Sequence, residues 1–322
     1  MTALDGIDPG IRAWIADDAR LQHELGFQEP SIDLAERRLR SIRLSDALAA
    51  EHSLPVADGC AIDELELPLP GGPALVRRYR PRDAAAALPT QLFLHGGGFA
   101  FGSARELVGD SLLSNRVVAT GLQILSLEYR LAPEHPYPAA RDQTIEAMRW
   151  LDEHAHDLQL DRDRLGLGGA SAGASIAASA ALLLGRDGHR PHHLALEVPA
   201  VSMAALETLT EDVGPAERSA LELARNLYVH GDSADAFIAD SKSIAELPST
   251  LVMLAERDAL RSGGELLVAR MREAGLPVAF HLVLGHFHGT ASVTVSSPAA
   301  QEWQELVDRE LLLAYGSAAR AA

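Results

Sequence analysis

Five small residues in the middle of the chain form a pattern that suits a serine nucleophile. The pattern is Gly169-Ala170-Ser171-Ala172-Gly173, which follows an apolar run and opens an alanine-rich helical stretch. Strand, tight turn and helix in that order make a nucleophile elbow, in which a strained serine presents its hydroxyl group. Gly-x-Ser-x-Gly alone is a weak signal in an alanine-rich chain, but this context makes Ser171 the candidate nucleophile.

A run of three glycines upstream suits stabilisation of a developing negative charge on oxygen. The run is His95-Gly96-Gly97-Gly98-Phe99, directly after a predicted strand. Glycines let backbone N–H groups approach a ligand without a Cβ in the way. We expect the N–H groups of Gly96, Gly97 and Ala172 to form an oxyanion hole, each worth about 3–4 kcal/mol of transition-state stabilisation. A glycine turn without function is the alternative.

A serine nucleophile needs a base, and the base needs an acid that orients it. Of the 13 histidines, two stand in Gly285-His286-Phe287-His288-Gly289, after the last predicted strand. We favour His288 because Gly289 and the small Thr290 suit a loop that leads into a helix. We expect His286 to support the site or to be exposed. A His-x-His metal pair is the alternative, although no third ligand cluster is apparent in the sequence.

The orienting acid is expected on the loop after the preceding strand. Glu256-Arg257-Asp258 follows the predicted strand over residues 250–255. Asp258 is preferred, because Glu256 is expected to belong to the end of the strand. A helix N-cap is the other interpretation of Asp258. The chain order Ser171, Asp258, His288 is that of α/β-hydrolase triads and favours the catalytic interpretation.

Four stretches resemble the bacterial hormone-sensitive lipase family of α/β-hydrolases. His95–Phe99 is similar to that family's oxyanion motif, and Tyr129-Arg-Leu-Ala-Pro-Glu-His-Pro-Tyr-Pro-Ala-Ala140 matches its long internal signature almost completely. Asp258-Ala-Leu-Arg resembles its Asp-Pro-Leu-Arg acid motif, and Gly285–Gly289 resembles its histidine loop. The family's histidine falls on His288. The resemblance covers roughly residues 88–322.

The resemblance implies a serine carboxylesterase that hydrolyses esters with short to medium acyl chains, and the acidic net charge favours small neutral ones. Ser171 would attack the ester carbonyl, His288 would take its proton and pass it to the leaving alcohol, and Asp258 would orient His288. Water would then release the acyl group from the enzyme. This chemistry requires no metal and no organic cofactor. An amidase or formamidase with the same triad stays open, and a non-catalytic ligand-binding protein is less favoured because all three residues are present.

Three stretches near the expected site depart from the family pattern. Ala170 stands where the family usually has Asp, and Gly173-Ala174-Ser175 stands where it has Gly-Gly-Asn. Residues 258–264 read Asp-Ala-Leu-Arg-Ser-Gly-Gly rather than Asp-Pro-Leu-Arg-Asp-Glu-Gly. None of the three changes a triad residue. They therefore leave the substrate class and the rate open, but not the type of reaction.

The elements that position these residues predict an α/β fold. Alternating or apolar runs predict strands over residues 62–69, 74–80, 91–94, 122–127, 164–168, 193–198, 250–255 and 278–284. Helical patterns lie between most of the later runs, which implies right-handed crossovers and a mostly parallel sheet with helices on both faces. We therefore expect an α/β-hydrolase fold with a helical cap.

Two segments outside this rhythm are expected to form the cap. Residues 1–50 form an N-terminal segment of two helices, the first opened by Pro9 and the second capped by Ser31. Residues 51–322 form the catalytic domain, in which about 202–247 have helical pieces and no convincing strand. Beneath the oxyanion loop we expect an ion-pair network of Arg130, Glu134 and Asp142. The substrate pocket is expected to be lined by Phe99, Phe101, Leu227 and Tyr228.

Composition excludes several partners. A net charge of −17 disfavours nucleic acid, anionic membranes and strongly anionic esters. No window approaches about 18 consecutive apolar residues, and the N-terminus has no pattern of a secretion signal. Cys60, the single cysteine, implies no oxidising compartment, so we expect a cytoplasmic enzyme. We also expect a homodimer through the last strand and helix, for which Trp303, Leu306 and Leu311 are candidates, although core packing explains them equally well.

Overall fold

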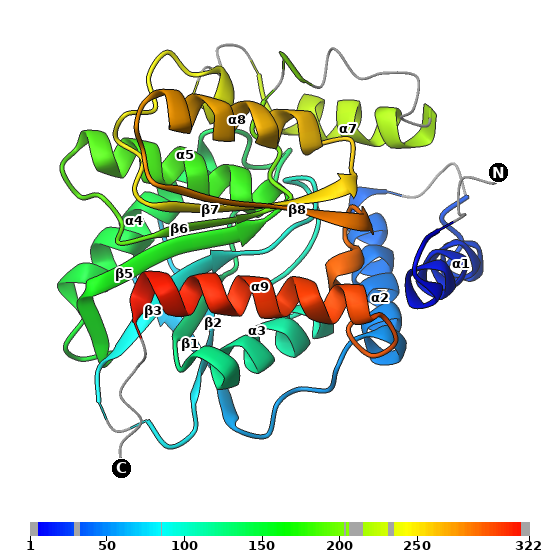
Figure 1. The fold of residues 1–322 in the computed structure, drawn as a ribbon, viewed down its shortest axis with the longest axis horizontal. Coiled ribbons are helices and arrows are strands. Elements are labelled where there is room, and N and C mark those ends of the chain that lie inside the picture. Colours follow the sequence, from blue (N-terminus) through cyan, green and yellow to red (C-terminus); the bar gives the residue numbers. More distant parts are fainter. Residues whose placement is uncertain are drawn as a thin grey trace.

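An eight-stranded sheet forms the centre of the molecule in the computed structural model (Figure 1), which describes residues 6–28, 33–84, 86–202, 204–205, 215–230 and 235–316. The strands follow one another across the sheet in the order β1-β2-β4-β3-β5-β6-β7-β8. Strand β2 pairs antiparallel with both β1 and β4, and the other neighbours are parallel. The bounds are β1 Cys60–Leu67, β2 Ala74–Pro81, β3 Leu88–Leu94, β4 Gln123–Leu127, β5 Leu160–Ala170, β6 Leu194–Glu197, β7 Thr250–Arg257 and β8 Val278–Phe287.

Helices cover both faces of the sheet. One face carries α3 (Leu107–Thr120) and α9 (Pro298–Tyr315), and the other carries α4 (Ala139–Glu153), α5 (Ala172–Arg186) and α8 (Arg261–Glu273) (Figure 1). Successive side chains of a strand point to opposite faces. Leu92 and Leu94 therefore join the core cluster around α5, whereas Phe93 between them joins the cluster beneath α3. A sheet buried on both sides requires the continuous apolar runs that the sequence shows.

The N-terminal helices lie at the end of the sheet to which the parallel strands point (Figure 1). They are α1 (Pro9–Glu24) and α2 (Leu34–His52). Pro9 opens α1 as predicted, and Asp8 caps it by accepting from two backbone N–H groups. The predicted cap Ser31 lies outside the described residues; the observed cap of α2 is Asp33, whose carboxylate accepts from the Glu36 N–H.

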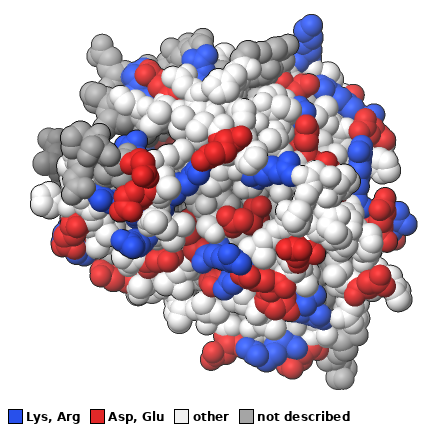
Figure 2. Space-filling view, turned by 180° about the vertical axis from the view of Figure 1, so that it is seen from behind, with Lys and Arg blue, Asp and Glu red and all other residues white. Residues whose placement is uncertain are grey.

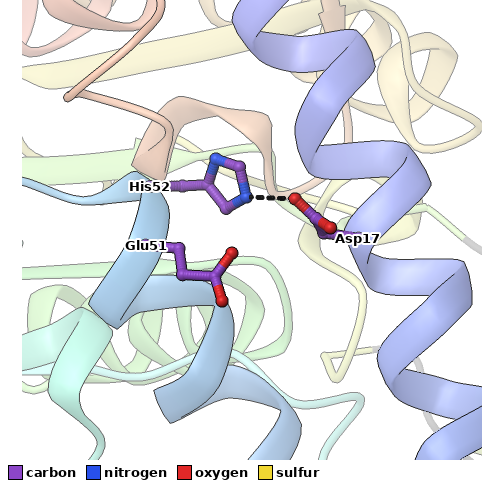
Figure 3. A group of neighbouring side chains, drawn as sticks. All are labelled: Asp17, Glu51 and His52. Carbon is purple, nitrogen blue, oxygen red and sulfur yellow. Dashed lines mark hydrogen bonds and ion pairs between the residues drawn. The ribbon is translucent and has the colours of Figure 1, made fainter.

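A hydrogen bond between two side chains ties α1 to the end of α2. The His52 Nε2 atom lies 3.1 Å from the Asp17 Oδ2 atom. Figure 3 shows the two side chains projecting toward each other, with the carboxylate of Glu51 close by. The neighbouring Arg20, which donates to Asp17, holds the pKa of that carboxyl below its ordinary value. This pair contributes to the position of α1 on α2.

The expected strands agree with the observed ones to within a few residues. The largest difference is β5, which spans Leu160–Ala170 rather than residues 164–168. The predicted cap insertion, residues 202–247, contains α7 (Pro215–Tyr228) and a 3₁₀ turn (Ile238–Asp240) in its described parts. Helix α7 lies near the same end of the sheet as α1 and α2 (Figure 1). The division into cap and catalytic domain stays a prediction.

Trp303 and Leu311 lie in the core beneath α9, at 1% and 0% exposure. Leu306 packs against the same cluster. Core packing therefore accounts for the three apolar residues that the sequence offered for a dimer contact.

Acidic and basic side chains are interspersed on the face seen in Figure 2, where the basic ones form no continuous area. No helix in the described part of the chain is long and apolar enough to cross a membrane.

Candidate active site

The turn between β5 and α5 holds Ser171 in an uncommon backbone conformation. Its φ of 54° and ψ of −120° lie in a region that residues other than glycine rarely adopt. A Cβ on Gly169 would lie 2.6 Å from the Gly173 carbonyl carbon, and a Cβ on Gly173 would collide with the Leu94 carbonyl oxygen. Only glycine fits at these two positions. The turn therefore places the Ser171 hydroxyl at the carboxyl end of the sheet, where α5 begins.

Two side chains from separate loops reach Ser171 in series. The His288 Nε2 atom lies 2.9 Å from the Ser171 Oγ atom, and the His288 Nδ1 atom lies 2.8 Å from the Asp258 Oδ2 atom. His288 directly follows β8, and Asp258 directly follows β7. Because parallel strands end at the same edge of the sheet, loops far apart in sequence meet there. The structure thus brings together the three residues that the sequence analysis selected.

Asp258 is buried and its second oxygen has a partner. Its side chain is 2% exposed, and its Oδ1 atom accepts from the Leu260 N–H at 2.9 Å. The carboxylate therefore accepts one hydrogen bond from the backbone while its other oxygen faces His288. Helix α8 begins at Arg261 without a side-chain cap, so Asp258 is not its N-cap residue.

Glu256, the alternative acid, and His286, the alternative base, form hydrogen bonds within and between the loops instead. The Glu256 Oε2 atom accepts from the Gly285 N–H at 2.8 Å, which ties the end of β7 to the histidine loop. His286 is fully buried, with its Nδ1 atom 2.9 Å from the Thr290 Oγ1 atom. Burial lowers the pKa of His286, so its neutral form is favoured. The expectation of an exposed His286 is wrong, because its ring is buried against Trp303 of α9.

The glycine run after β3 lies beside the nucleophile. A Cβ on Gly96 would lie 3.5 Å from the Ser171 Cβ atom, so the two backbones are in contact distance. Gly97 has a φ of 126°, and a Cβ there would collide with the Phe101 carbonyl oxygen. Within the described part of the chain, no hydrogen bond uses the N–H groups of Gly96, Gly97 or Ala172. Three donors are therefore available next to Ser171.

Helix α2 supports this loop through a residue that the sequence analysis missed. Arg38 donates to the carbonyl oxygens of Ala100 at 2.8 Å and of Ala132 at 2.7 Å. It also pairs with Glu134, at 2.7 Å. A single exposed-looking arginine in a predicted helix carries no signal of such a contact, since its partners lie more than 60 residues away.

The predicted network of Arg130, Glu134 and Asp142 is wrong. Glu134 pairs with Arg38, as described above, and Asp142 pairs with the adjacent Arg141 at 2.7 Å. The Arg130 guanidinium donates to the Gly71 carbonyl oxygen, in the turn between β1 and β2. The prediction paired charges that are close in sequence, whereas the fold supplies partners from distant segments.

Two cavities meet at Ser171. The smaller has a volume of about 270 Å³ and the larger about 500 Å³, and both are lined by Gly98, Ser171 and His288. The smaller cavity extends beneath α7 and is mainly apolar. The larger one extends between α1, α2 and α3. Ala170 lines the larger cavity, so the small residue found in place of the family's usual Asp leaves room there.

Of the four predicted pocket residues, only Phe99 lines one of these cavities. Helix α7 presents Leu221 and Ala224 to the smaller cavity instead of Leu227 and Tyr228. The Tyr228 ring is buried behind the pocket, stacked on the Phe99 ring at 3.9 Å between centroids. Phe101 is partly buried and does not line either cavity. Packing sets the rotation of α7 about its axis, which the sequence pattern did not reveal.

In the described part of the chain, one group of possible ligand side chains has its atoms close enough together to hold a metal ion: Asp17, Glu51 and His52 (Figure 3). None of them lines a cavity at Ser171. The predicted alternative of a His286-His288 pair is not favoured by the geometry, because His286 contacts Thr290 and His288 contacts Ser171 and Asp258.

Comparison with known proteins agrees with this geometry. A family model described as the alpha/beta hydrolase fold matches residues 91–292. Esterase LipI of Mycobacterium tuberculosis is 30% identical over 259 residues, 77% of this chain and 80% of LipI. Ethyl acetate hydrolase of Pseudomonas putida is 31% identical over 289 residues, 86% of this chain and 84% of that enzyme.

A solved structure extends the likeness to nearly the whole chain. The ester-hydrolase EH1AB1 from the metagenome of Lake Arreo, complexed with a derivative of bipyridine phosphonate, superimposes with a TM-score of 0.84. It is 26% identical in sequence, and the match covers 97% of this chain and 100% of that one. The chain therefore belongs to the hormone-sensitive lipase family of α/β-hydrolase carboxylesterases, and it is a carboxylic ester hydrolase.

Proposed function

We propose that the protein is a serine carboxylesterase that cleaves neutral esters with short to medium acyl chains through Ser171, His288 and Asp258. The observation that carries the proposal is the pair of contacts at 2.9 Å and 2.8 Å that join these three side chains in series. A hydroxyl group with an ordinary pKa is a weak nucleophile, and an adjacent oriented base activates it.

In the proposed reaction His288 first acts as base. Its Nε2 atom takes the proton of Ser171 while the Oγ atom forms a bond to the ester carbonyl carbon. Asp258 accepts from Nδ1 and stabilises the imidazolium that results. The carbonyl electrons move to the oxygen, where the N–H groups of Gly96, Gly97 and Ala172 donate to it.

The tetrahedral intermediate then collapses. His288 passes its proton to the leaving alcohol, and the acyl group stays on Ser171. A water molecule repeats the sequence and releases the acid. This cycle requires no metal and no organic cofactor, because the charge that develops on oxygen is stabilised by backbone donors.

The sizes of the two cavities support the substrate class. Volumes of about 270 Å³ and 500 Å³ suit one short arm and one longer arm of an ester. The lining of the smaller cavity by Phe99, Leu221 and Phe237 favours an apolar arm. The net charge of −17 supports neutral substrates over anionic ones.

A serine-reactive phosphonate, followed by mass mapping of the labelled peptide, tests the nucleophile. We expect one label, on Ser171, and none in a Ser171→Ala variant that still folds. A label on another serine would refute the assignment. Parallel assays of matched ester and amide substrates over a series of acyl lengths then measure chain-length preference and decide between an esterase and an amidase.

The setting and the assembly are further proposals. We propose a cytoplasmic enzyme with no nucleic-acid or membrane partner, on the grounds of the single cysteine and the acidic composition. We also propose a homodimer through β8, which is an edge strand and carries the 66% exposed Leu284. Light scattering after size exclusion measures the molecular mass and tests this assembly.

A further inference from the structure

A buried pair of opposite charges lies in the wall of the larger cavity, formed there by α3, β6 and α9. The Arg116 Nη1 atom lies 2.9 Å from the Glu197 Oε1 atom, and their side chains are 2% and 9% exposed. Both residues line the larger cavity, which is otherwise mainly apolar. The proposed reaction makes no use of this pair.

The pair lies close to the nucleophile. Glu197 ends β6 and is paired with Ala170 in the register of the sheet. Its carbonyl oxygen accepts from the Ser171 N–H at 2.8 Å. Since neighbouring strands are about 4.8 Å apart and a glutamate side chain is of similar length, its carboxylate lies within reach of a substituent a few atoms from the reacting carbonyl.

Both members of the pair retain unused hydrogen-bonding capacity among the described residues. Arg116 has five N–H donors. The Arg116 side chain donates to Glu197 and to the Gln304 Oε1 atom, at 3.0 Å, while its buried Nε atom has no hydrogen-bond partner in the described part of the chain. Glu197 accepts one further bond, from the Trp303 Nε1 atom at 3.0 Å. Each carboxylate oxygen can accept two bonds, so lone pairs remain.

The chemistry of the pair selects the kind of group that fits beside it. An anionic group would meet Arg116 but be repelled by Glu197, and also by Asp308, whose carboxylate lies 3.8 Å from the Arg116 Nε atom. A cationic group would be attracted by Glu197 and Asp308, but Arg116 already pairs with both carboxylates and would repel it. An apolar group would leave buried donors and acceptors without partners, which is unfavourable. A hydroxyl group both donates and accepts, and so satisfies both members.

We propose that the larger cavity is a subsite for a hydroxyl-bearing arm of the ester, with the hydroxyl group bound between Arg116 and Glu197. The proposal rests on the proposed esterase function and names its substrate class: esters of hydroxylated acids or of diols. The hydroxyl group donates to the Glu197 carboxylate and accepts from the Arg116 guanidinium. The rest of the arm contacts the apolar wall.

The decisive measurement compares matched substrates on the unaltered enzyme. One series consists of 4-nitrophenyl esters of straight-chain acids with and without a terminal hydroxyl group, and a second consists of acetates of alcohols and of the corresponding diols. In one series we expect the hydroxylated ester to have a kcat/KM about tenfold higher, since a hydrogen bond to a charged group is of that strength. The preference for the hydroxylated ester should be greatest at one chain length, because the hydroxyl group must span a fixed distance between the reacting carbonyl and the charged pair.

The variant Arg116→Leu/Glu197→Leu tests whether the pair causes the preference. Replacement of both members by apolar residues of similar size leaves neither of the two as an unpaired buried charge, but Asp308 loses the cation 3.8 Å from its carboxylate. We expect the ratio of kcat/KM between hydroxylated and plain esters to fall to about one. The matched control is Leu221→Ala in the smaller cavity, which changes that cavity's volume and should leave the ratio as it is in the unaltered enzyme.

Glu197→Gln serves if the double variant does not fold, because it keeps the shape and removes the charge. It should lower the ratio severalfold. A ratio near one at every chain length in both series, with plain esters hydrolysed, would overturn the subsite and leave the esterase proposal standing. A preference that survives in the variants would also overturn it. If the enzyme hydrolyses no ester, both proposals fail.

Discussion

His288 and His286 stand two residues apart, yet their surroundings assign them different work. The ring of His288 joins Ser171 to Asp258, whereas His286 is buried beside Trp303, with ring centroids 5.3 Å apart. We therefore predict that His288→Ala lowers kcat by about 10⁴–10⁶-fold without a loss of thermal stability. His286→Ala should lower the melting temperature and leave kcat within about tenfold. Steady-state kinetics and thermal denaturation of both variants check this ranking, and the reverse ranking would identify His286 as the base.

Asp258 is the residue whose charge matters most to the orientation of His288. Asp258→Asn keeps an oxygen for the Leu260 N–H but presents an amide to His288, which favours the wrong tautomer. We expect kcat to fall by about 10⁴-fold, as in other enzymes with a Ser-His-Asp triad. Glu256→Gln is the matched control, since its amide oxygen still accepts from the Gly285 N–H, and it should change kcat by only a few-fold. A loss of only a few-fold in Asp258→Asn would move the role to Glu256.

Among the secondary-structure elements, α2 has the most direct effect on the oxyanion loop. Arg38 on α2 donates to the carbonyl groups of Ala100 and Ala132. Arg38→Met removes these bonds, so we expect a loss of about 2 kcal/mol in the free energy of unfolding and a kcat/KM about tenfold lower. Glu134→Gln keeps both backbone bonds and should cost less than about 1 kcal/mol. Denaturant unfolding and kinetics measure both effects; equal losses in the two variants would show that the ion pair, not the backbone contact, matters.

The start of α3 gives the stability of the protein a pH dependence. Burial, together with the nearby carboxylates of Asp46 and Glu128, raises the pKa of Glu106 from 4.5 to about 7. The folded protein then binds more protons than the unfolded chain between about pH 4.5 and pH 7, so the free energy of unfolding falls as the pH rises through this range. The contribution of the protonated Glu106 carboxyl to the free energy of unfolding is fully present below pH 4.5, and it is lost above pH 7.

Glu106→Gln mimics the protonated form at every pH. We expect this variant to equal the unaltered protein below about pH 4.5 and to exceed it by about 2 kcal/mol above pH 7, after allowance for the partial exposure of the side chain. Denaturant unfolding at a series of pH values measures the difference. A constant difference across the range would show that Glu106 has an ordinary pKa.

The sequence predicts the positions of single strands well, but it does not predict how separate elements pack against one another. Strands such as β7, expected over residues 250–255 and observed over Thr250–Arg257, follow from apolar runs because burial on both faces demands them. Ser171 and His288 are recognisable because their chemistry requires fixed residue types next to glycines. Arg38 and the cavity-lining face of α7 were not predictable, since they depend on how elements distant in sequence pack together.

The whole molecule carries a net charge of −17, and its field acts on any charged substrate. Repulsion between exposed charges weakens with added salt, since the screening length falls from about 30 Å at 0.01 M to about 3 Å at 1 M. We predict that kcat/KM for monomethyl glutarate, an anion, rises several-fold over this range. The value for dimethyl glutarate, which is neutral, should stay nearly constant. Kinetics of the two esters across the salt series test the prediction, and parallel responses would contradict it.

The two cavities that meet at Ser171 differ in volume, and this difference sets the orientation in which an ester binds. An ester can bind with its small arm in the cavity of about 270 Å³ and its large arm in the cavity of about 500 Å³. The reverse placement does not fit, because the large arm exceeds the smaller cavity. A symmetric diester presents the same choice at either end and is cleaved first at one of them. The product then carries a carboxylate, which the negative field of the protein disfavours. The enzyme should therefore stop at the monoester and convert symmetric diesters into unsymmetrical half-esters, which makes it a candidate catalyst for desymmetrisation.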